Sequence, residues 1–406
     1  MNFNDVDRIL QRYVDDLVLP GVSYAVLQGR DVVRTNTIGY SDVESKIPLR
    51  SDDLFRVMSN TKLVTSCGIL LLLEDGLIGL DDPIEKYIPA LGARKVLGPH
   101  ARTIDDTQWA QGSITIAHLL THTSGLSYGL FDPGSILFNA YKERKVLNAN
   151  LTLAQMIDVL TDLPLKFEPG SGWEYSVSTD VLGRLIEVVS GVDLAQFFQA
   201  RIFDPLNMVD TSFWIPPQKQ SRLAGYYRGA DRFDPMKPGL TRVDSPLHRD
   251  AYLIPSPRLS AGGGLVSTLA DMVALIQSLL PSTLPNTLPN TLINRSKTLL
   301  KPATITLMMR NQLPQDRSIR FDHLGEIHGM GFGLGGAVTQ VPLPNHPVAS
   351  LGEFQWGGIA GTHWWISPGT GLSAVIMTQR EMAFWHPFSF DFKNAVYAAA
   401  DFGSVE

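Results

Sequence analysis

The chain has almost no cysteine and no long hydrophobic run. Its 406 residues include a single cysteine, Cys67, so no internal disulfide can form, and its place in an apolar run predicts a buried core thiol. That run, residues 67–73, is the longest one and is far too short to cross a bilayer. Residues 1–16 lack the basic start and continuous apolar stretch of a signal peptide. We therefore expect a cytoplasmic protein without a membrane span.

Strong charge of either sign is also missing. The net charge is −6, from 34 Lys and Arg against 40 Asp and Glu, and no basic cluster stands out along the chain. This balance argues against a nucleic-acid partner. Hydrophobic residues make up 44% of the chain and charged residues 18%, as in an ordinary globular protein long enough to build two subdomains.

Strand patterns lie at both ends of the chain, and helical patterns lie between them. The N-terminal part predicts an amphipathic helix and a two-stranded hairpin, and the C-terminal part predicts an antiparallel meander and a closing helix. The expected fold is α+β, with an antiparallel sheet built from both chain ends, flanked by helices, and an inserted helical domain. The predicted elements are a helix over 3–17, strands over 21–27, 32–38, 349–356, 361–366 and 372–378, and a helix over 390–400.

The predicted domains are residues 1–80 plus 259–406, which carry the sheet, and residues 81–258, which are mostly helical with long loops. Within 215–258 no periodicity is visible, and we expect a surface insertion or lid there. A doubled Thr-Leu-Pro-Asn in 283–290 predicts an exposed loop, because proline at that density breaks helices and strands. Further helical pieces are expected over 114–121, 153–160, 180–190, 194–202 and 268–280.

The most informative short motif is Ser59-Asn-Thr-Lys62, the one Ser-x-x-Lys in the chain. It opens an apolar helix that Gly76 is placed to end, and helical spacing puts the hydroxyl and the amine on one face. A serine becomes nucleophilic when a neighbouring base takes its proton. A lysine can be that base if burial or nearby positive charge lowers its pKa. The alternative is a helix cap with a first-turn lysine.

Two other patterns compete with this motif. Gly125-Leu-Ser127-Tyr-Gly129 matches the nucleophile elbow of α/β-hydrolases, but a helical pattern precedes it and a loop pattern follows, so the required strand–turn–helix context is missing. His118 and His122 have the spacing of a metal pair, yet no third ligand lies near them in sequence, and a structural role is favoured.

Several segments in order resemble one family, the serine β-lactamase-like superfamily of class C β-lactamases, D-Ala-D-Ala peptidases and family VIII carboxylesterases, with the last group the most similar. The resemblance covers nearly the whole chain and implies a penicillin-binding-protein-like fold with no metal or cofactor. The segments that carry it are Ser59-x-x-Lys62, Ile-Thr-Ile-Ala-His-Leu-Leu-Thr-His-Thr-Ser-Gly-Leu (114–126), Phe-Glu-Pro-Gly-Ser-Gly-Trp-Glu-Tyr-Ser (167–176), Ile-Phe-Asp-Pro-Leu-Asn-Met (202–208) and Gly-Gly-Gly-Leu-Val-Ser-Thr-Leu-Ala-Asp-Met (262–272).

The resemblance implies further site residues. Its second motif matches Tyr175-Ser-Val, so Tyr175 would share proton transfer with Lys62. Its third motif, Lys-Thr-Gly in lactamases and peptidases, falls on Trp356-Gly357-Gly358. An indole and two glycines replace a cation and a hydroxyl, which favours neutral esters over anionic substrates and is similar to family VIII esterases. The implied oxyanion hole consists of the backbone N–H groups of Ser59 and Ile359.

The expected activity is therefore hydrolysis of small esters with short to medium acyl chains through an acyl-enzyme on Ser59, with weak β-lactam hydrolysis as a possible side reaction. A class C-like β-lactamase or D-amino peptidase is one alternative, with Arg258 or His363 supplying the missing cation. An acyltransferase is another, and a non-catalytic acyl- or cell-wall-sensing protein a third. The sequence does not indicate an oligomeric state.

Overall fold

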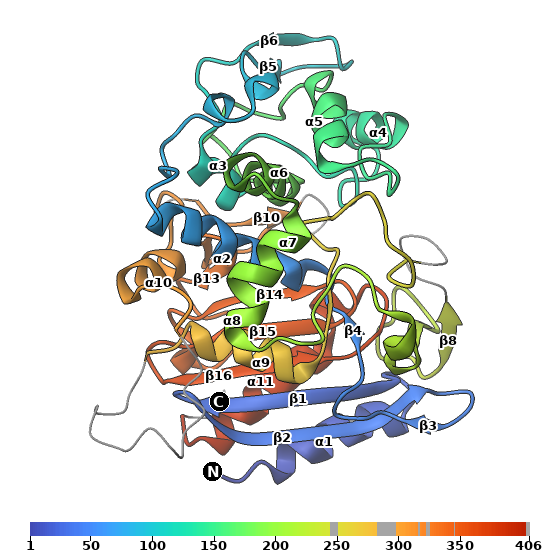
Figure 1. Ribbon diagram of the computed structural model, residues 1–406. Helices are drawn as coiled ribbons and strands as arrows, with labels where there is room; N and C mark the ends of the chain where they lie inside the picture. Colours follow the sequence, from blue (N-terminus) through green and yellow to red (C-terminus); the bar gives the residue numbers. More distant parts are fainter. Residues whose placement is uncertain (244–250, 282–297, 316, 322–324, 345, 403–406) are drawn as a thin grey trace.

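The centre of the protein is an eight-stranded antiparallel sheet made from both ends of the chain, as the computed structural model shows (Figure 1). The structure describes residues 1–243, 251–281, 298–315, 317–321, 325–344 and 346–402. N-terminal β1 pairs with C-terminal β16, which confirms the predicted fold class. In spatial order the strands are β12 (Met330–Phe332), β13 (Ala337–Thr339), β14 (Phe354–Gly358), β15 (Thr362–Ile366), β16 (Leu372–Met377), β1 (Gly21–Gln28), β2 (Asp31–Asp42) and β3 (Ile47–Pro48).

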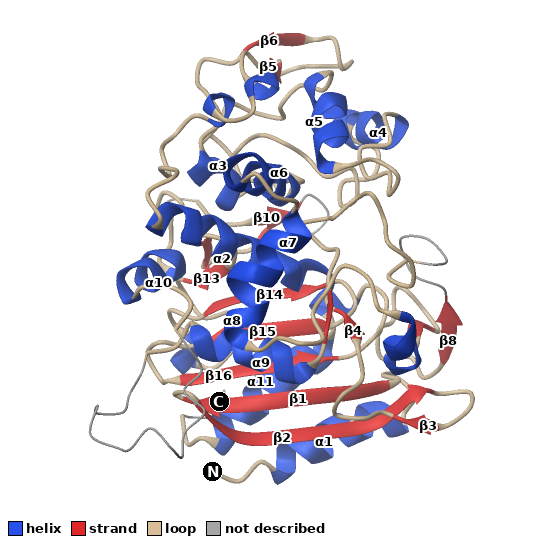
Figure 2. Cartoon of the chain, viewed as in Figure 1, coloured by secondary structure: helices blue, strands red, loops and turns tan. Residues whose placement is uncertain are grey.

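Helices cover both faces of the sheet, as the blue and red layers of Figure 2 show. The terminal helices α1 (Asn4–Asp15) and α11 (Pro387–Ala399) lie on one face, and α2 (Thr61–Glu74) and α9 (Leu269–Ser278) lie on the other. Alternate residues of a strand point to opposite faces. In β1, Tyr24 accordingly joins the core beneath the terminal helices, whereas Ala25 joins the core around α2.

A group of helices stacks beyond α2, on the side away from the sheet (Figure 1). The central member, α6 (Ser178–Ser190), contacts α2, α3 and α5. Capping boxes at Thr115 and Thr152 satisfy the first backbone N–H groups of α3 and α5. The predicted helical pieces are confirmed, while three short helices among the described residues were not predicted. The group consists of α3 (Ile116–Leu120), α4 (Ile136–Glu143) and α5 (Leu153–Thr161) around α6; the unpredicted helices are α4, α8 (Asp204–Leu206) and α10 (Pro302–Met309).

The segment 215–258 is more regular than predicted. It contains a hairpin of β7 (Tyr226–Gly229) and β8 (Leu240–Val243), which lies beside the end of the sheet. The Tyr227 backbone N–H donates to the Gln379 carbonyl, and the Gly225 N–H donates to the Ser41 carbonyl. These strands are short and held by such long-range pairing, which leaves little periodicity in the sequence. The division into two domains stays a prediction.

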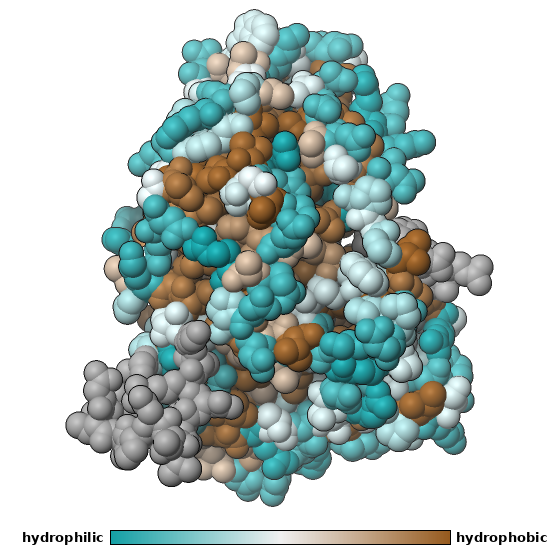
Figure 3. Space-filling model, viewed as in Figure 1, coloured by the Kyte–Doolittle hydropathy of each residue, from teal (hydrophilic) through white to brown (hydrophobic). Residues whose placement is uncertain are grey.

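Other sequence predictions differ in part. The strand expected over 349–356 begins at Phe354, because Val348–Ser350 forms a 3₁₀ turn. The doubled motif of 283–290 lies outside the described residues. None of the described helices is long and apolar enough to cross a membrane. In Figure 3, polar side chains cover most of the lower part of the viewed face, and apolar ones gather at the level of α2, α3 and α6.

Candidate active site

Ser59 lies in a short 3₁₀ turn, Met58–Asn60, that leads directly into α2. The chain enters this turn from β4 (Phe55–Arg56), which pairs with β9 (Val266–Ser267). Met58 has a φ of 47°, in the left-handed region that a side chain other than glycine seldom adopts. This sharp entry places Ser59 at the N-terminal end of a helix that is buried over nearly its whole length.

Two further side chains meet at Ser59. The Tyr175 hydroxyl donates a hydrogen bond of 2.8 Å to Ser59 Oγ, and the Lys62 Nζ atom lies 4.6 Å from the centroid of the Tyr175 ring. Lys62 Nζ itself donates to the Gly262 carbonyl at 2.7 Å. All three side chains are buried. The structure thus brings together the three residues for which the sequence predicted proton transfer.

Lys62 could act as a neutral base only if its pKa were lowered, and its surroundings do not lower it. Burial disfavours its ammonium form, but the neighbouring oxygens of Tyr128, Tyr175 and Asp180 outweigh burial and raise the pKa of Lys62 above its ordinary value. The raised pKa favours the ammonium form of Lys62. The hydroxyl that contacts Ser59 is that of Tyr175.

Tyr128 is a site residue that sequence reasoning missed. The Tyr128 ring stacks on the Tyr175 ring with the two centroids 5.5 Å apart, and Lys62 Nζ lies 5.4 Å from the centroid of the Tyr128 ring. Burial raises the pKa of Tyr128 to about 12, so this phenol stays protonated at neutral pH. Its position beside the predicted site comes from the loop between α3 and α4, and no spacing rule in the sequence connects it to Lys62.

The two patterns that competed with Ser59 have structural roles here. Ser127 lies in a loop and donates to Glu174 at 3.0 Å, without a strand before it or a helix directly after it. His118 caps α3, and His122 Nδ1 bonds with Ser176 while its ring lies 4.9 Å from that of Tyr175. Among the residues that the structure describes, no three His, Cys, Asp or Glu side chains form a metal-binding group.

Strand β14 brings the Trp-Gly-Gly segment against the nucleophile turn. The Trp356 indole N–H donates to the Tyr175 hydroxyl at 3.3 Å. A Cβ on Gly358 would lie 2.5 Å from the Val57 carbonyl oxygen, so only glycine allows this approach. Ile359 follows in the turn after β14 and packs with Met58. A Cβ on Gly357, on the other face of the strand, would lie 2.3 Å from the ring of His363.

The two residues considered as substitute cations are engaged elsewhere. The side chain of Arg258 is buried, with Nη2 3.5 Å from Asp180 Oδ1 and Nη1 donating to the Val146 carbonyl at 2.6 Å. The His363 ring nitrogen Nε2 lies 3.3 Å from the Ala383 carbonyl, and burial lowers the pKa of His363 to about 4. Neither side chain supplies a free positive charge beside Trp356.

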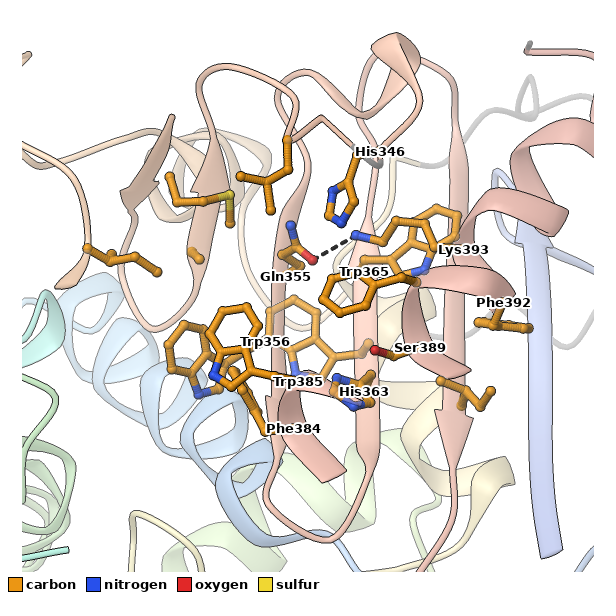
Figure 4. A pocket seen from close by; sticks show the side chains of 17 residues that line it. His346, Gln355, Trp356, His363, Trp365, Phe384, Trp385, Ser389, Phe392 and Lys393 are labelled. Carbon is orange, nitrogen blue, oxygen red and sulfur yellow. Dashed lines mark hydrogen bonds between the residues drawn. The ribbon is translucent and has the colours of Figure 1, made fainter. Parts of the chain in front are cut away.

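A small cavity of about 60 Å³ lies next to Trp356 (Figure 4). Its aromatic part is formed by Trp356, Phe384 and Trp385, and Lys393 and Gln355, joined by a hydrogen bond of 2.7 Å, line its polar part. Lys393 belongs to α11, so the cavity extends toward the face of the sheet away from Ser59. Trp356 lines this cavity and also contacts Tyr175 in the candidate active site.

Comparisons with known proteins identify the family of the chain. The family model described as Beta-lactamase matches residues 6–385. Protein Rv1367c of Mycobacterium tuberculosis is 32% identical over 93% of this chain and 90% of its own length, and esterase EstB of Burkholderia gladioli is 27% identical over 97% and 94%. The solved structure of EstCE1, described as a hydrolase with promiscuous acyltransferase activity, superposes with a TM-score of 0.78 at 27% identity, covering 97% of each chain. The chain therefore belongs to the β-lactamase family of serine hydrolases, which includes esterases and acyltransferases among its relatives.

Proposed function

We propose that the protein is a carboxylesterase that forms an acyl-enzyme on Ser59. The observation that carries this proposal is the hydrogen bond of 2.8 Å from the Tyr175 hydroxyl to Ser59 Oγ, with the Lys62 cation beside the same ring. In this hydrogen bond Tyr175 is the donor; once it has lost its proton, the same contact lets it accept the proton of Ser59, which is the arrangement of an activated nucleophile.

In the first step Tyr175 acts as its phenolate. Ser59 Oγ attacks the ester carbonyl carbon while the Tyr175 phenolate takes the hydroxyl proton and becomes a neutral phenol. The positive charge of Lys62 stabilises the negative charge that Tyr175 carries as a base. The tetrahedral oxyanion is stabilised by the backbone N–H groups of Ser59 and Ile359, each contributing roughly 3 kcal/mol if they resemble other oxyanion donors. The carbon–oxygen bond to the alcohol then breaks, and Tyr175 returns its proton to the departing alkoxide.

In the second step water replaces the alcohol. Tyr175 takes a proton from the water as the water oxygen attacks the acyl carbon, and Ser59 leaves with that proton. Another alcohol in place of water gives acyl transfer to a new ester. The description of EstCE1 as a hydrolase with promiscuous acyltransferase activity supports this as the second candidate activity.

The wall beside Ser59 favours neutral esters. Trp356 presents a buried indole where the lactamases and peptidases that the chain resembles have a lysine, and Arg258 and His363 do not replace that cation. Binding of a substrate carboxylate against this apolar wall is disfavoured, because burying an unpaired charge costs several kcal/mol or more. Similarity to esterase EstB supports the same substrate class.

The test is parallel hydrolysis of p-nitrophenyl butyrate and a chromogenic cephalosporin by the wild type and by Ser59→Ala. We expect rapid ester cleavage, slow or no cephalosporin cleavage, and loss of both in the variant. Ser127→Ala is the matched control, since Ser127 is also a buried serine with one side-chain partner. Rapid cephalosporin cleavage with little esterase activity would contradict the substrate class.

A further inference from the structure

A buried carboxylate lies close to Lys62 and has no part in the mechanism above. Asp180, in the first turn of α6, is fully buried. Its Oδ1 atom accepts a hydrogen bond of 2.8 Å from Ser260 Oγ and lies 3.5 Å from Arg258 Nη2. Its Oδ2 atom is buried without a hydrogen-bond partner. A carboxylate oxygen left in this state requires a compensating positive charge nearby.

Gly262 shows where that oxygen is directed. A Cβ built on Gly262 would lie 2.8 Å from Asp180 Oδ2 and 3.3 Å from Lys62 Nζ. The carboxylate oxygen and the ammonium are therefore within about 6 Å of each other, a range in which opposite charges favour each other's charged forms. Any side chain at this position would be forced between them, so the glycine keeps the two charges close.

The other charged or titratable groups around Lys62 cannot replace this carboxylate. Tyr128 is a neutral phenol, and the pKa of His122 is lowered well below its usual value by burial and by the charge of Lys62 itself. Arg258 adds positive charge on the far side of Asp180. Tyr175 must stay free to exchange a proton with Ser59. Among the groups named here, Asp180 is therefore the one that supplies a negative charge beside Lys62.

We infer that Asp180 is a positioning residue that keeps Lys62 protonated, so that Lys62 acts as a fixed cation and Tyr175 alone exchanges the proton with Ser59. The inference rests on the proposed function, because it assigns roles within that same site. It predicts that activity falls at high pH when Lys62 loses its proton, and that the pH of this alkaline limb depends on Asp180. The rise of the pKa of Lys62 supports the same direction.

The experiment measures kcat/KM for p-nitrophenyl butyrate against pH for the wild type, Ser59→Ala, Asp180→Asn and Asp271→Asn. Asn can still accept the Ser260 hydrogen bond but carries no charge. The alkaline limb of Asp180→Asn should move to lower pH by about one unit, so that kcat/KM at a fixed pH on that limb falls by about tenfold. Asp271 is a matched control, since it is a buried aspartate on α9 that bonds with Thr211.

A second variant has the opposite sign and keeps the test open if Asp180→Asn does not fold. Arg258→Gln removes a positive charge that shares the Asp180 carboxylate, so its alkaline limb should move to higher pH. An unchanged limb in a folded Asp180→Asn, or in Arg258→Gln, would overturn the inference. So would a shift of the acid limb with increased activity at neutral pH, because Lys62 would then be the base. Wild-type protein without Ser59-dependent esterase activity would instead refute the proposed function.

Discussion

At the scale of single residues, the candidate site is defined by the contact between the Tyr175 and Ser59 hydroxyl groups. Tyr175 donates to Ser59 and accepts from the Trp356 indole, and six aromatic rings of the described residues, including those of Tyr128 and His122, lie within contact distance of its own. The sequence predicted Ser59, Lys62, Tyr175 and Trp356 because each falls in an ordered family motif. Tyr128 and Asp180 were not predicted, because their proximity to Lys62 is created by packing between distant segments.

The first prediction concerns Tyr175→Phe. The variant keeps the aromatic packing but removes the proton acceptor, so kcat for ester hydrolysis should fall by about 10² to 10⁴-fold while KM changes little. Tyr24→Phe is the control, because Tyr24 is also a buried tyrosine whose hydroxyl donates a hydrogen bond. Its partner is Asp7, and it lies on the opposite face of the sheet. Stopped-flow or steady-state kinetics on both variants would measure the difference. Equal losses in the two variants would indicate a structural effect.

At the scale of elements, the contact between β14 and the turn before Ser59 determines whether the proposed oxyanion hole can form. Gly358 allows that contact, and the Thr362 hydroxyl fixes it by donating to the Val57 carbonyl at 3.0 Å. The meander that contains β14 could be predicted from its short β-branched and aromatic runs. The start of β14 could not, because the 3₁₀ turn at Val348–Ser350 begins with two apolar residues, as a strand can.

The second prediction follows from this contact. In Gly358→Ala the added Cβ would meet the Val57 oxygen at 2.5 Å and the Met58 Cβ at 2.9 Å, so the strand must move away from the nucleophile turn. We expect a fall in kcat of at least about tenfold, as for loss of an oxyanion donor. Gly369→Ala is the matched control, since its Cβ would meet nothing within 4 Å. If both variants keep wild-type kcat, Ile359 does not contribute its N–H as proposed.

At the scale of the whole molecule, the sheet joins the two ends of the chain, and its second face is closed by α1 and α11. The patterns at residues 3–38 and 361–400 predicted these elements because strands and amphipathic helices there bury long regular faces. The hairpin β7–β8 was not predicted, since its residues gain their order from contacts with residues 41 and 379. Local patterns could predict the scaffold, while the surroundings of the site required tertiary structure.

The third prediction concerns acid. His346 and His386 are buried, and burial lowers their pKa values to about 3 and about 4, with the charges of Lys393 and Arg380 adding to the effect. Both should be neutral in the folded protein at pH 5, whereas an unfolded histidine with a pKa of about 6.5 takes up a proton. The unfolded state then binds more protons, so stability is full above pH 6.5 and falls as the pH decreases toward 4.

Urea unfolding between pH 7.5 and 4.5 would measure this loss, which should reach about 2 kcal/mol for each histidine at pH 4.5. In His346→Phe the loss of unfolding free energy between pH 7.5 and 4.5 should be smaller by the contribution of one histidine. A free energy of unfolding that stays constant over this range would contradict the assignment of neutral, buried histidines.

Ser59 is the residue that we expect to be acylated during turnover. The most direct measurement is peptide mass spectrometry of the protein after reaction with a fluorophosphonate ester, which phosphonylates an activated serine and stays bound. We expect stoichiometric labelling on the peptide that contains Ser59, and loss of labelling in Ser59→Ala and Tyr175→Phe. Labelling of Ser127 instead, or of no serine in a folded protein, would contradict this expectation.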